Sequence, residues 1–282
     1  MHAPPTPPPP ERPELPEGAD AQPRWPAWYA VAGFGVGLVA TFIAVGVVAA
    51  ATGTTSAEDN PTFTIVATLM QSAAFVGAAL LFASLTARPR LRHFGLRQAP
   101  FWPTVGWAAL GMFSFYLFSA VYTVAVHPHA EQSITQSLGA DQGAFGLIAA
   151  GFMVVCIAPV AEELFFRGFF YRALRSRFSV LAAAGLDGVL FGSIHFDFSG
   201  ADALLILPPL AFLGFVFCLV YERTGSLFPT IALHAINNAI AFGVQADGWA
   251  VSAVLGPLMV AGCCLAPQLS GRARGVPAPA LR

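Results

Sequence analysis

Two adjacent glutamates lie inside a long apolar stretch, in the run AEELFFR at residues 161–167. A carboxylate within the hydrocarbon layer of a membrane is costly and is by default a candidate for function. Arg167 follows Glu163 by one helical turn, so these two side chains share a face and can form an ion pair. Glu162 points about 100° away from Glu163 and lacks that partner. We therefore expect Glu163 to be structural and Glu162 to activate a water as a general base. The alternative is a single buried ionic cluster of both acids and Arg167.

Two histidines and an asparagine further along the chain also have apolar surroundings. His195 ends the run FGSIH, and the run HAINN places His234 and Asn238 one helical turn apart on a shared face, with Asn237 pointing elsewhere. If the chain turns back midway between Glu162 and His195, antiparallel helices bring those two residues to similar depth. Three membrane segments thus offer side chains to one site.

This donor set is compatible with two kinds of water activation. Glu162, His195 and His234 could bind a divalent metal such as zinc and leave one position for water. The same side chains could hold a catalytic water without a metal, while Asn238 or a histidine stabilises the oxyanion. The H-E-x-x-H helix of many zinc peptidases does not occur in the sequence. Both alternatives stay open.

The elements that position these residues must be membrane helices. Of the 282 residues, 56% are hydrophobic and only 10% are charged, whereas a soluble domain carries about a quarter charged residues. Apolar stretches recur near the length of about 20 residues that crosses a bilayer as a helix. We predict an all-α fold, a polytopic bundle of about eight transmembrane helices. Their expected ranges are 28–51, 62–86, 103–126, 143–165, 180–197, 203–222, 227–245 and 249–267.

The placement of charges supports this count. With eight spans, the tails and the connections at 87–102, 166–179 and 223–226 fall on one face and contain all the arginines of the loops. The alternate connections contain acids and no arginine. The positive-inside rule makes the arginine-bearing face cytoplasmic. We expect a multi-pass integral membrane protein with both termini in the cytoplasm, located in the plasma membrane if its source is bacterial.

The two ends of the chain differ from the rest. Residues 1–26 contain ten prolines and little apolar surface, which predicts a disordered Pro-rich cytoplasmic tail. Residues 27–270 form the predicted transmembrane domain, with a catalytic core at about 143–245, and residues 271–282 form a cytoplasmic C-terminal tail. A net charge of −1 without a basic run gives no support to a nucleic-acid partner, and we expect none.

Asp187 is a further acid in an apolar segment, two helical turns before His195. Two roles are open for it: it could line the same cavity as Glu162, or it could pair with an arginine of a neighbouring helix.

Three motifs in this order resemble the CPBP family (CAAX protease and bacteriocin-processing), which includes the type II CAAX prenyl endopeptidases. They are Glu-Glu-x-x-x-Arg at 162–167, Phe-x-x-x-His at 191–195 and His-x-x-x-Asn at 234–238. The resemblance covers about 90–245. It implies an eight-helix membrane fold with a polar cavity open to the cytosolic side, and hydrolysis of a peptide bond by a Glu-activated water. It also implies roles for the matching residues: Glu162 as base, Glu163 and Arg167 in support, and His195, His234 and Asn238 positioning the water or stabilising the oxyanion.

The combined interpretation is a CPBP-type intramembrane endopeptidase, metal-dependent or not. Its partners would be a peptide or membrane-protein substrate near the cytoplasmic face and the surrounding membrane lipid. One alternative is a non-catalytic immunity or scaffold protein that keeps the same fold. Another is a proton-coupled transporter with Glu162, Glu163 and His195 as a relay, although no symmetry between the two halves of the sequence supports it.

Overall fold

The computed structural model describes residues 23–53, 60–127, 134–196 and 201–269, and within these ranges every regular element is a helix. Most of the predicted N-terminal tail and the predicted C-terminal tail lie outside the described residues. The long helices are α1 (Trp28–Thr52), α2 (Pro61–Ser84), α3 (Phe101–Val126), α8 (Val180–Ser193), α9 (Leu207–Thr224), α10 (Phe228–Gln245) and α11 (Trp249–Leu269). The all-α fold class is confirmed.

One further segment, Gly143–Leu174, carries the glutamate pair and is helical throughout. Its geometry changes along its length. It consists of α5 (Gly143–Phe152), a π-helical turn η2 (Met153–Ile157), α6 (Ala158–Glu163), a second π-helical stretch η3 (Leu164–Tyr171) and α7 (Arg172–Leu174). Single π-helical turns inside α-helices are rare and occur often at functional sites.

Helices thus occupy all eight predicted ranges. Six of them are long and apolar enough to cross a membrane. The other two are α8, which is apolar but has 14 residues, and α10, which has 18 residues and contains His234, Asn237 and Asn238. Large apolar side chains face outward, for example Phe42 on α1 and Phe113 on α3, which are 74% and 66% exposed. Such faces suit contact with lipid rather than water.

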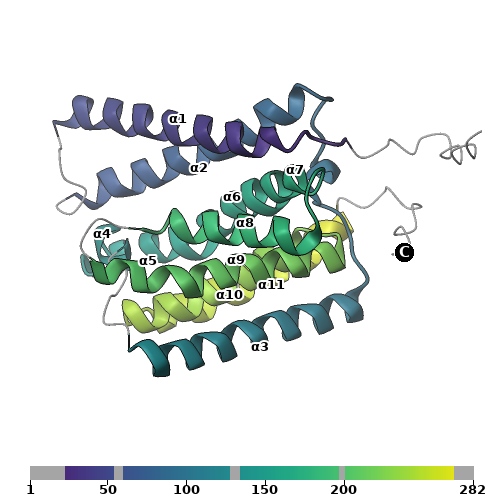
Figure 1. The fold of residues 1–282 in the computed structure, drawn as a ribbon. Helices are drawn as coiled ribbons and strands as arrows, with labels where there is room; N and C mark the ends of the chain where they lie inside the picture. The colour runs from purple at the N-terminus through teal and green to yellow at the C-terminus, as the bar shows by residue number, and fades with distance from the viewer. Residues whose placement is uncertain (1–22, 54–59, 128–133, 197–200, 270–282) are drawn as a thin grey trace, which may run out of the picture.

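The helices run back and forth, so that the described connections gather at two ends of the bundle (Figure 1). One end, which we name the arginine end, holds the 310 turn η1 (Leu91–Phe94), the turn at 175–179 and the turn at 225–227. The described arginines of the loops lie there, beside the starts of α1 and α3 and the end of α11. The opposite end, which we name the acidic end, holds α4 (Ile134–Ser137), Asp141 and Asp247.

Two kinds of packing fix the π-helical stretch η3. On one side its phenylalanines are buried and contact the rings of α1 and α2, as where Phe165 meets Phe75 at a centroid distance of 4.8 Å. On the other side lie α8 and α9, which pack along each other. They approach closely because Gly188 has no side chain: a Cβ there would lie 2.4 Å from the Ala211 carbonyl oxygen. This contact brings side chains of α8 and α9 next to η3.

Candidate active site

The predicted pair of Glu163 and Arg167 forms the centre of a buried polar cluster. The Arg167 Nη1 donates to Glu163 Oε1 at 2.8 Å, and both side chains are fully buried. Glu163 ends α6 and Arg167 lies in η3, one turn later. The i,i+4 spacing therefore predicted this contact correctly.

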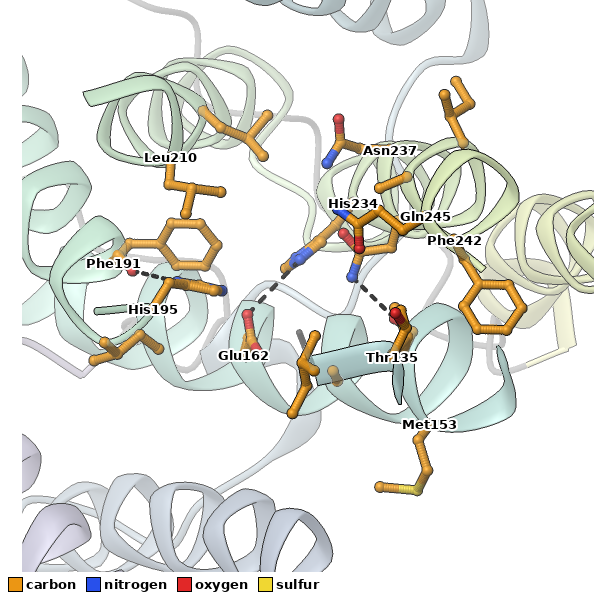
Figure 2. A pocket seen from close by; sticks show the side chains of 18 of the residues that line it. Thr135, Met153, Glu162, Phe191, His195, Leu210, His234, Asn237, Phe242 and Gln245 are labelled. Carbon is orange, nitrogen blue, oxygen red and sulfur yellow. Dashed lines mark hydrogen bonds and ion pairs between the residues drawn. The ribbon is translucent and has the colours of Figure 1, made fainter. Parts of the chain in front are cut away.

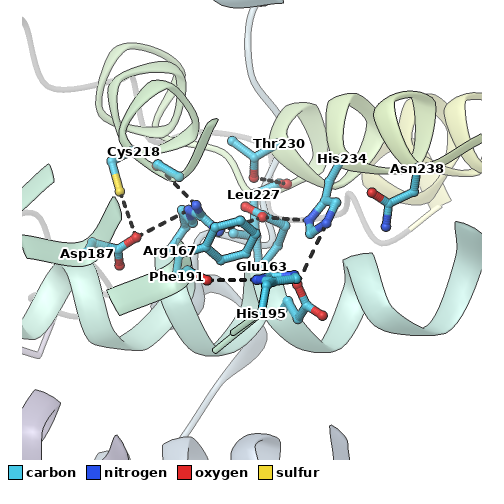
Figure 3. A network of polar contacts seen from close by, with 12 residues as sticks. Glu163, Arg167, Asp187, Phe191, His195, Cys218, Leu227, Thr230, His234 and Asn238 are labelled. Carbon is cyan, nitrogen blue, oxygen red and sulfur yellow. Dashed lines mark hydrogen bonds and ion pairs between the residues drawn. The ribbon is translucent and has the colours of Figure 1, made fainter. Parts of the chain in front are cut away.

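Arg167 also binds the helix pair α8–α9 (Figure 3). Its Nη2 donates to the Gly214 carbonyl at 3.0 Å, and its Nε lies 3.6 Å from Asp187 Oδ1. The ring of Phe191 lies 4.4 Å from the guanidinium carbon, within the range of a cation–π contact. A guanidinium suits this position because its nitrogens can serve several acceptors at once.

Asp187 is therefore a partner of a neighbouring arginine and not a residue of the cavity described below. Its side chain is fully buried, and the Cys218 thiol donates to the same Oδ1 at 3.1 Å. Of the two roles left open for Asp187, the structure favours pairing with Arg167.

His234 links this buried cluster to the second glutamate. Its Nδ1 lies 3.0 Å from Glu163 Oε1, the oxygen that also accepts from Arg167. An ionised carboxylate can only accept, so the hydrogen lies on His234 Nδ1 and Nε2 is turned the other way. Nε2 lies 3.7 Å from Glu162 Oε2. Both glutamates thus contact the same imidazole, one at each nitrogen.

Glu162 differs from Glu163 in exposure and in partners. Its side chain retains 24% exposure, against 0% for Glu163, and it lines a cavity. Among the described residues, none forms a hydrogen bond with Glu162 Oε2, and this oxygen is itself covered by neighbouring atoms. The two adjacent carboxylates are thus divided in the predicted way, one held in an ionic cluster and one facing a cavity.

The cavity has a volume of about 600 Å³, and its wall also contains three other predicted site residues, His195, His234 and Asn238 (Figure 2). His195 lies just after α8, and its Nδ1 donates to the Phe191 carbonyl at 2.9 Å, which leaves Nε2 available. Asn238 donates from Nδ2 to the Val154 carbonyl in η2 at 2.9 Å. An amide nitrogen carries two hydrogens, so Asn238 keeps one for a ligand.

Sequence reasoning missed several polar residues of this cavity. Asn237, which we expected to point elsewhere, also lines it, and Tyr116 of α3 donates to the Asn237 side chain at 3.5 Å. Thr68 and Gln71 of α2 contribute from the other side. The available signal was the hydroxyl and amide side chains within otherwise apolar helices.

The tentative metal ligands Glu162, His195 and His234 all line the cavity. Among the residues that the structure describes, however, no three His, Cys, Asp or Glu side chains lie close enough together to hold a metal ion. The donor types suit zinc, but their arrangement does not. The proposed steps of hydrolysis therefore use the side chains without a metal.

The cavity extends from these residues toward the acidic end. Its described wall includes Ile134, Thr135, Ser137 and Leu138 around α4 and Gln245 at the end of α10, and no residue of η1 or of the turns at the arginine end. The resemblance implied a cavity open to the cytosolic side, and the charge pattern made the arginine end cytoplasmic. In this structure those two expectations disagree.

Comparison with known proteins supports the resemblance. Residues 144–240 match the family model described as "Type II CAAX prenyl endopeptidase Rce1-like". A relative in Bacillus subtilis (strain 168), the uncharacterized protein YyaK, is 32% identical over 127 residues, which is 44% of this chain. The chain thus spans only 42% of that relative. No solved structure matches the chain significantly. The matched segment contains all three motifs, so the similarity to CPBP-type CAAX proteases is confirmed, and with the six apolar helices it indicates an integral membrane protein.

Proposed function

We propose, from the similarity of residues 144–240 to the Rce1-like family, that the chain is an intramembrane endopeptidase that hydrolyses a peptide bond with a Glu162-activated water. The proposed site is the cavity between Glu162, His195, His234 and Asn238. The proposed location is the cell membrane, with both termini and the arginine end in the cytoplasm.

The observation that carries this proposal is that two neighbouring carboxylates differ in burial and in hydrogen-bond partners. Glu163 is fully buried and bonded to Arg167 and His234, so it cannot approach a substrate. Glu162 faces the cavity with Oε2 lacking a partner, 3.7 Å from His234 Nε2. We propose that a cavity water bonds to the Glu162 carboxylate on its exposed side, because Oε2 itself is covered by neighbouring atoms. A carboxylate in that position can accept the proton of the water as it attacks a carbonyl carbon.

The remaining residues supply the other requirements of peptide hydrolysis. Attack of the water forms the C–O bond and places negative charge on the carbonyl oxygen. The second amide hydrogen of Asn238 is the proposed donor to that oxyanion, and His195 can add a hydrogen bond from Nε2 when its ring is protonated, since the hydrogen on Nδ1 is bonded to Phe191. The proton on Glu162 then passes to the amine as the C–N bond breaks, so protons balance over the cycle. His234 fixes the water, and Glu163 and Arg167 position His234.

A divalent metal held by Glu162, His195 and His234 stays a proposal of its own. It would act as a Lewis acid on the water or on the carbonyl oxygen. The three side chains would have to move closer together to bind it, and none of the steps above requires it.

The test compares membranes from cells that express the wild type, Glu162→Gln or Asp141→Asn. The Asp141 variant is the matched control, since it removes a carboxylate from the acidic end outside the cavity wall. We expect products that depend on the wild type and on Asp141→Asn, and a loss of about 10²–10⁴-fold in their formation with Glu162→Gln. Mass spectrometry of the released peptides would also identify the substrate.

An unchanged peptide profile, together with Glu162→Gln rescuing the phenotype of a knockout, would contradict catalysis. It would favour the immunity or scaffold alternative, in which the same fold binds another membrane protein.

A further inference from the structure

We infer that the substrate reaches Glu162 from the extracytoplasmic side of the membrane, as a neutral, extended segment of an exported or membrane-anchored polypeptide. This inference rests on the proposed function, because it names the substrate class of the same site. It begins from the position of the cavity in the bundle.

Most of the described residues that line the cavity lie in the halves of their helices nearer the acidic end, whereas Glu162 and His234 lie near the middle of theirs. Helix α2 begins at that end and contributes Thr68 and Gln71, whereas α3 finishes there and contributes Phe115, Tyr116 and Ser119. The last residue of α10, Gln245, lines the cavity, and so does α4, which lies at the acidic end itself. The space therefore runs from mid-bundle outward in one direction.

Buried side chains fill the bundle between the cavity and the arginine end. Between Glu162 and the arginine end lie Glu163 and Arg167, both fully buried, and the buried phenylalanine side chains of η3. At the arginine end itself, the backbone around Gly95 is bonded to the turn before α10: Leu227 N donates to the Gly95 carbonyl at 2.7 Å, and Ser226 Oγ donates to the Arg97 carbonyl at 2.6 Å. A peptide entering from this end would have to break the ionic cluster.

The distribution of arginine sets the orientation. The sequence has no lysine, and all the arginines of the described residues except Arg167 belong to the N-terminal tail, connections or helix ends on the arginine side. The connections on the acidic side contain no arginine. The positive-inside rule places the arginine end in the cytoplasm, which puts the acidic end and the cavity on the extracytoplasmic side.

The chemistry of the wall limits the substrate further. Among the residues that the structure describes, the wall includes amides and hydroxyls such as Gln71, Asn237 and Tyr116, with Glu162 as the one acid and no arginine. Amide side chains can both donate to and accept from an extended peptide backbone. A free terminal carboxylate would find no arginine and would lie near Glu162. The wall therefore suits an internal, uncharged segment.

The experiment measures from which side the cavity is reached. Thr68→Cys and Gln245→Cys probe the cavity wall, and Ser176→Cys is the control at the arginine end. Each is placed in a full-length chain in which Cys156, Cys263 and Cys264 are alanine and the buried Cys218 is kept. Right-side-out and inside-out vesicles of a bacterial inner membrane are treated with a membrane-impermeant maleimide.

We expect label on both cavity positions in right-side-out vesicles, and on Ser176→Cys only in inside-out vesicles. Label on Thr68→Cys only in inside-out vesicles would overturn the inference, as would no label in either preparation. Label on Ser176→Cys from the outside would overturn the assigned orientation.

Because labelling does not depend on catalysis, the two proposals fail separately. Adding Glu162→Gln to the labelled variants should leave the labelling pattern unchanged. If the labelling pattern is as expected but no cleavage product depends on Glu162, the cavity is open to the extracytoplasmic side and the peptidase proposal is wrong.

Discussion

Replacing Arg167 with methionine should destabilise the protein strongly, because one guanidinium serves acceptors on three segments. It binds Glu163 at 2.8 Å, the Gly214 carbonyl at 3.0 Å and Asp187 at 3.6 Å, and it is fully buried. Methionine fills much of the volume but leaves two buried carboxylates without their cation. Removing one partner of a buried ion pair costs about 3–5 kcal/mol.

The expected size can be expressed as a melting temperature. For domains of a few hundred residues, 1 kcal/mol corresponds to about 2–4 °C. Arg167→Met should therefore lower the midpoint of thermal unfolding in detergent by about 6–20 °C. Intrinsic fluorescence can follow the transition, because Trp25 is buried against Phe169 of η3 at a centroid distance of 5.4 Å. Arg167→Lys should also destabilise, since an ammonium cannot reach all three acceptors from one stem.

Glu162→Gln is the matched comparison, because it removes a neighbouring charge that is partly exposed and outside the ionic cluster. Its midpoint should stay within about 2 °C of the wild type. The reasoning is wrong if Arg167→Met has the same unfolding midpoint as the wild type. It is also wrong if the midpoint of Glu162→Gln falls as far as that of Arg167→Met. Adding Asp187→Asn to Arg167→Met should restore part of the loss, because one uncompensated charge disappears.

Two further predictions concern helix packing and the metal. Gly188→Ala should lower the unfolding midpoint, because its Cβ would lie 2.4 Å from the Ala211 carbonyl, whereas Gly185→Ala on the same helix meets nothing within 4 Å and should not. Equal midpoints for the two variants would contradict the close approach of α8 and α9. Purified protein should contain zinc below one equivalent and should retain cleavage in a chelator, because the donors are not gathered. One equivalent of zinc that is lost in both Glu162→Gln and His234→Ala would instead support the metal site.

Much of this fold was predictable because membrane helices follow from apolar length alone. Helices occupy all eight predicted ranges, and the pairing of Glu163 with Arg167 followed from their spacing within one helix. Glu162 and Glu163 point in different directions, as predicted, because both lie in α6, a regular α-helical piece. Local contacts within one element need no knowledge of the neighbouring elements.

Features that depend on contacts between helices were not predictable. The π-helical turns on either side of α6 leave no mark in the hydrophobic pattern, because nearly every residue there is apolar. The pairing of Asp187 with Arg167 could be predicted only with the knowledge that α8 and η3 lie side by side. The direction of the cavity was also beyond the sequence, because it depends on how several helices, far apart in the sequence, separate at one end of the bundle. The family resemblance and the charge pattern predict opposite sides of the membrane for the opening of this cavity.

The oxygen Glu163 Oε1, which accepts from both Arg167 and His234, has a consequence for how such chains can diverge. A descendant that loses Glu162 keeps this oxygen and its partners, so it can still fold and be retained for binding alone. A descendant that loses Glu163 loses the scaffold and the imidazole orientation together, and selection removes it whatever its role. We therefore expect Glu163 and Arg167 in active and inactive relatives alike. Glu162 should be present in the relatives that hydrolyse peptides and can be lost in those that only bind a partner.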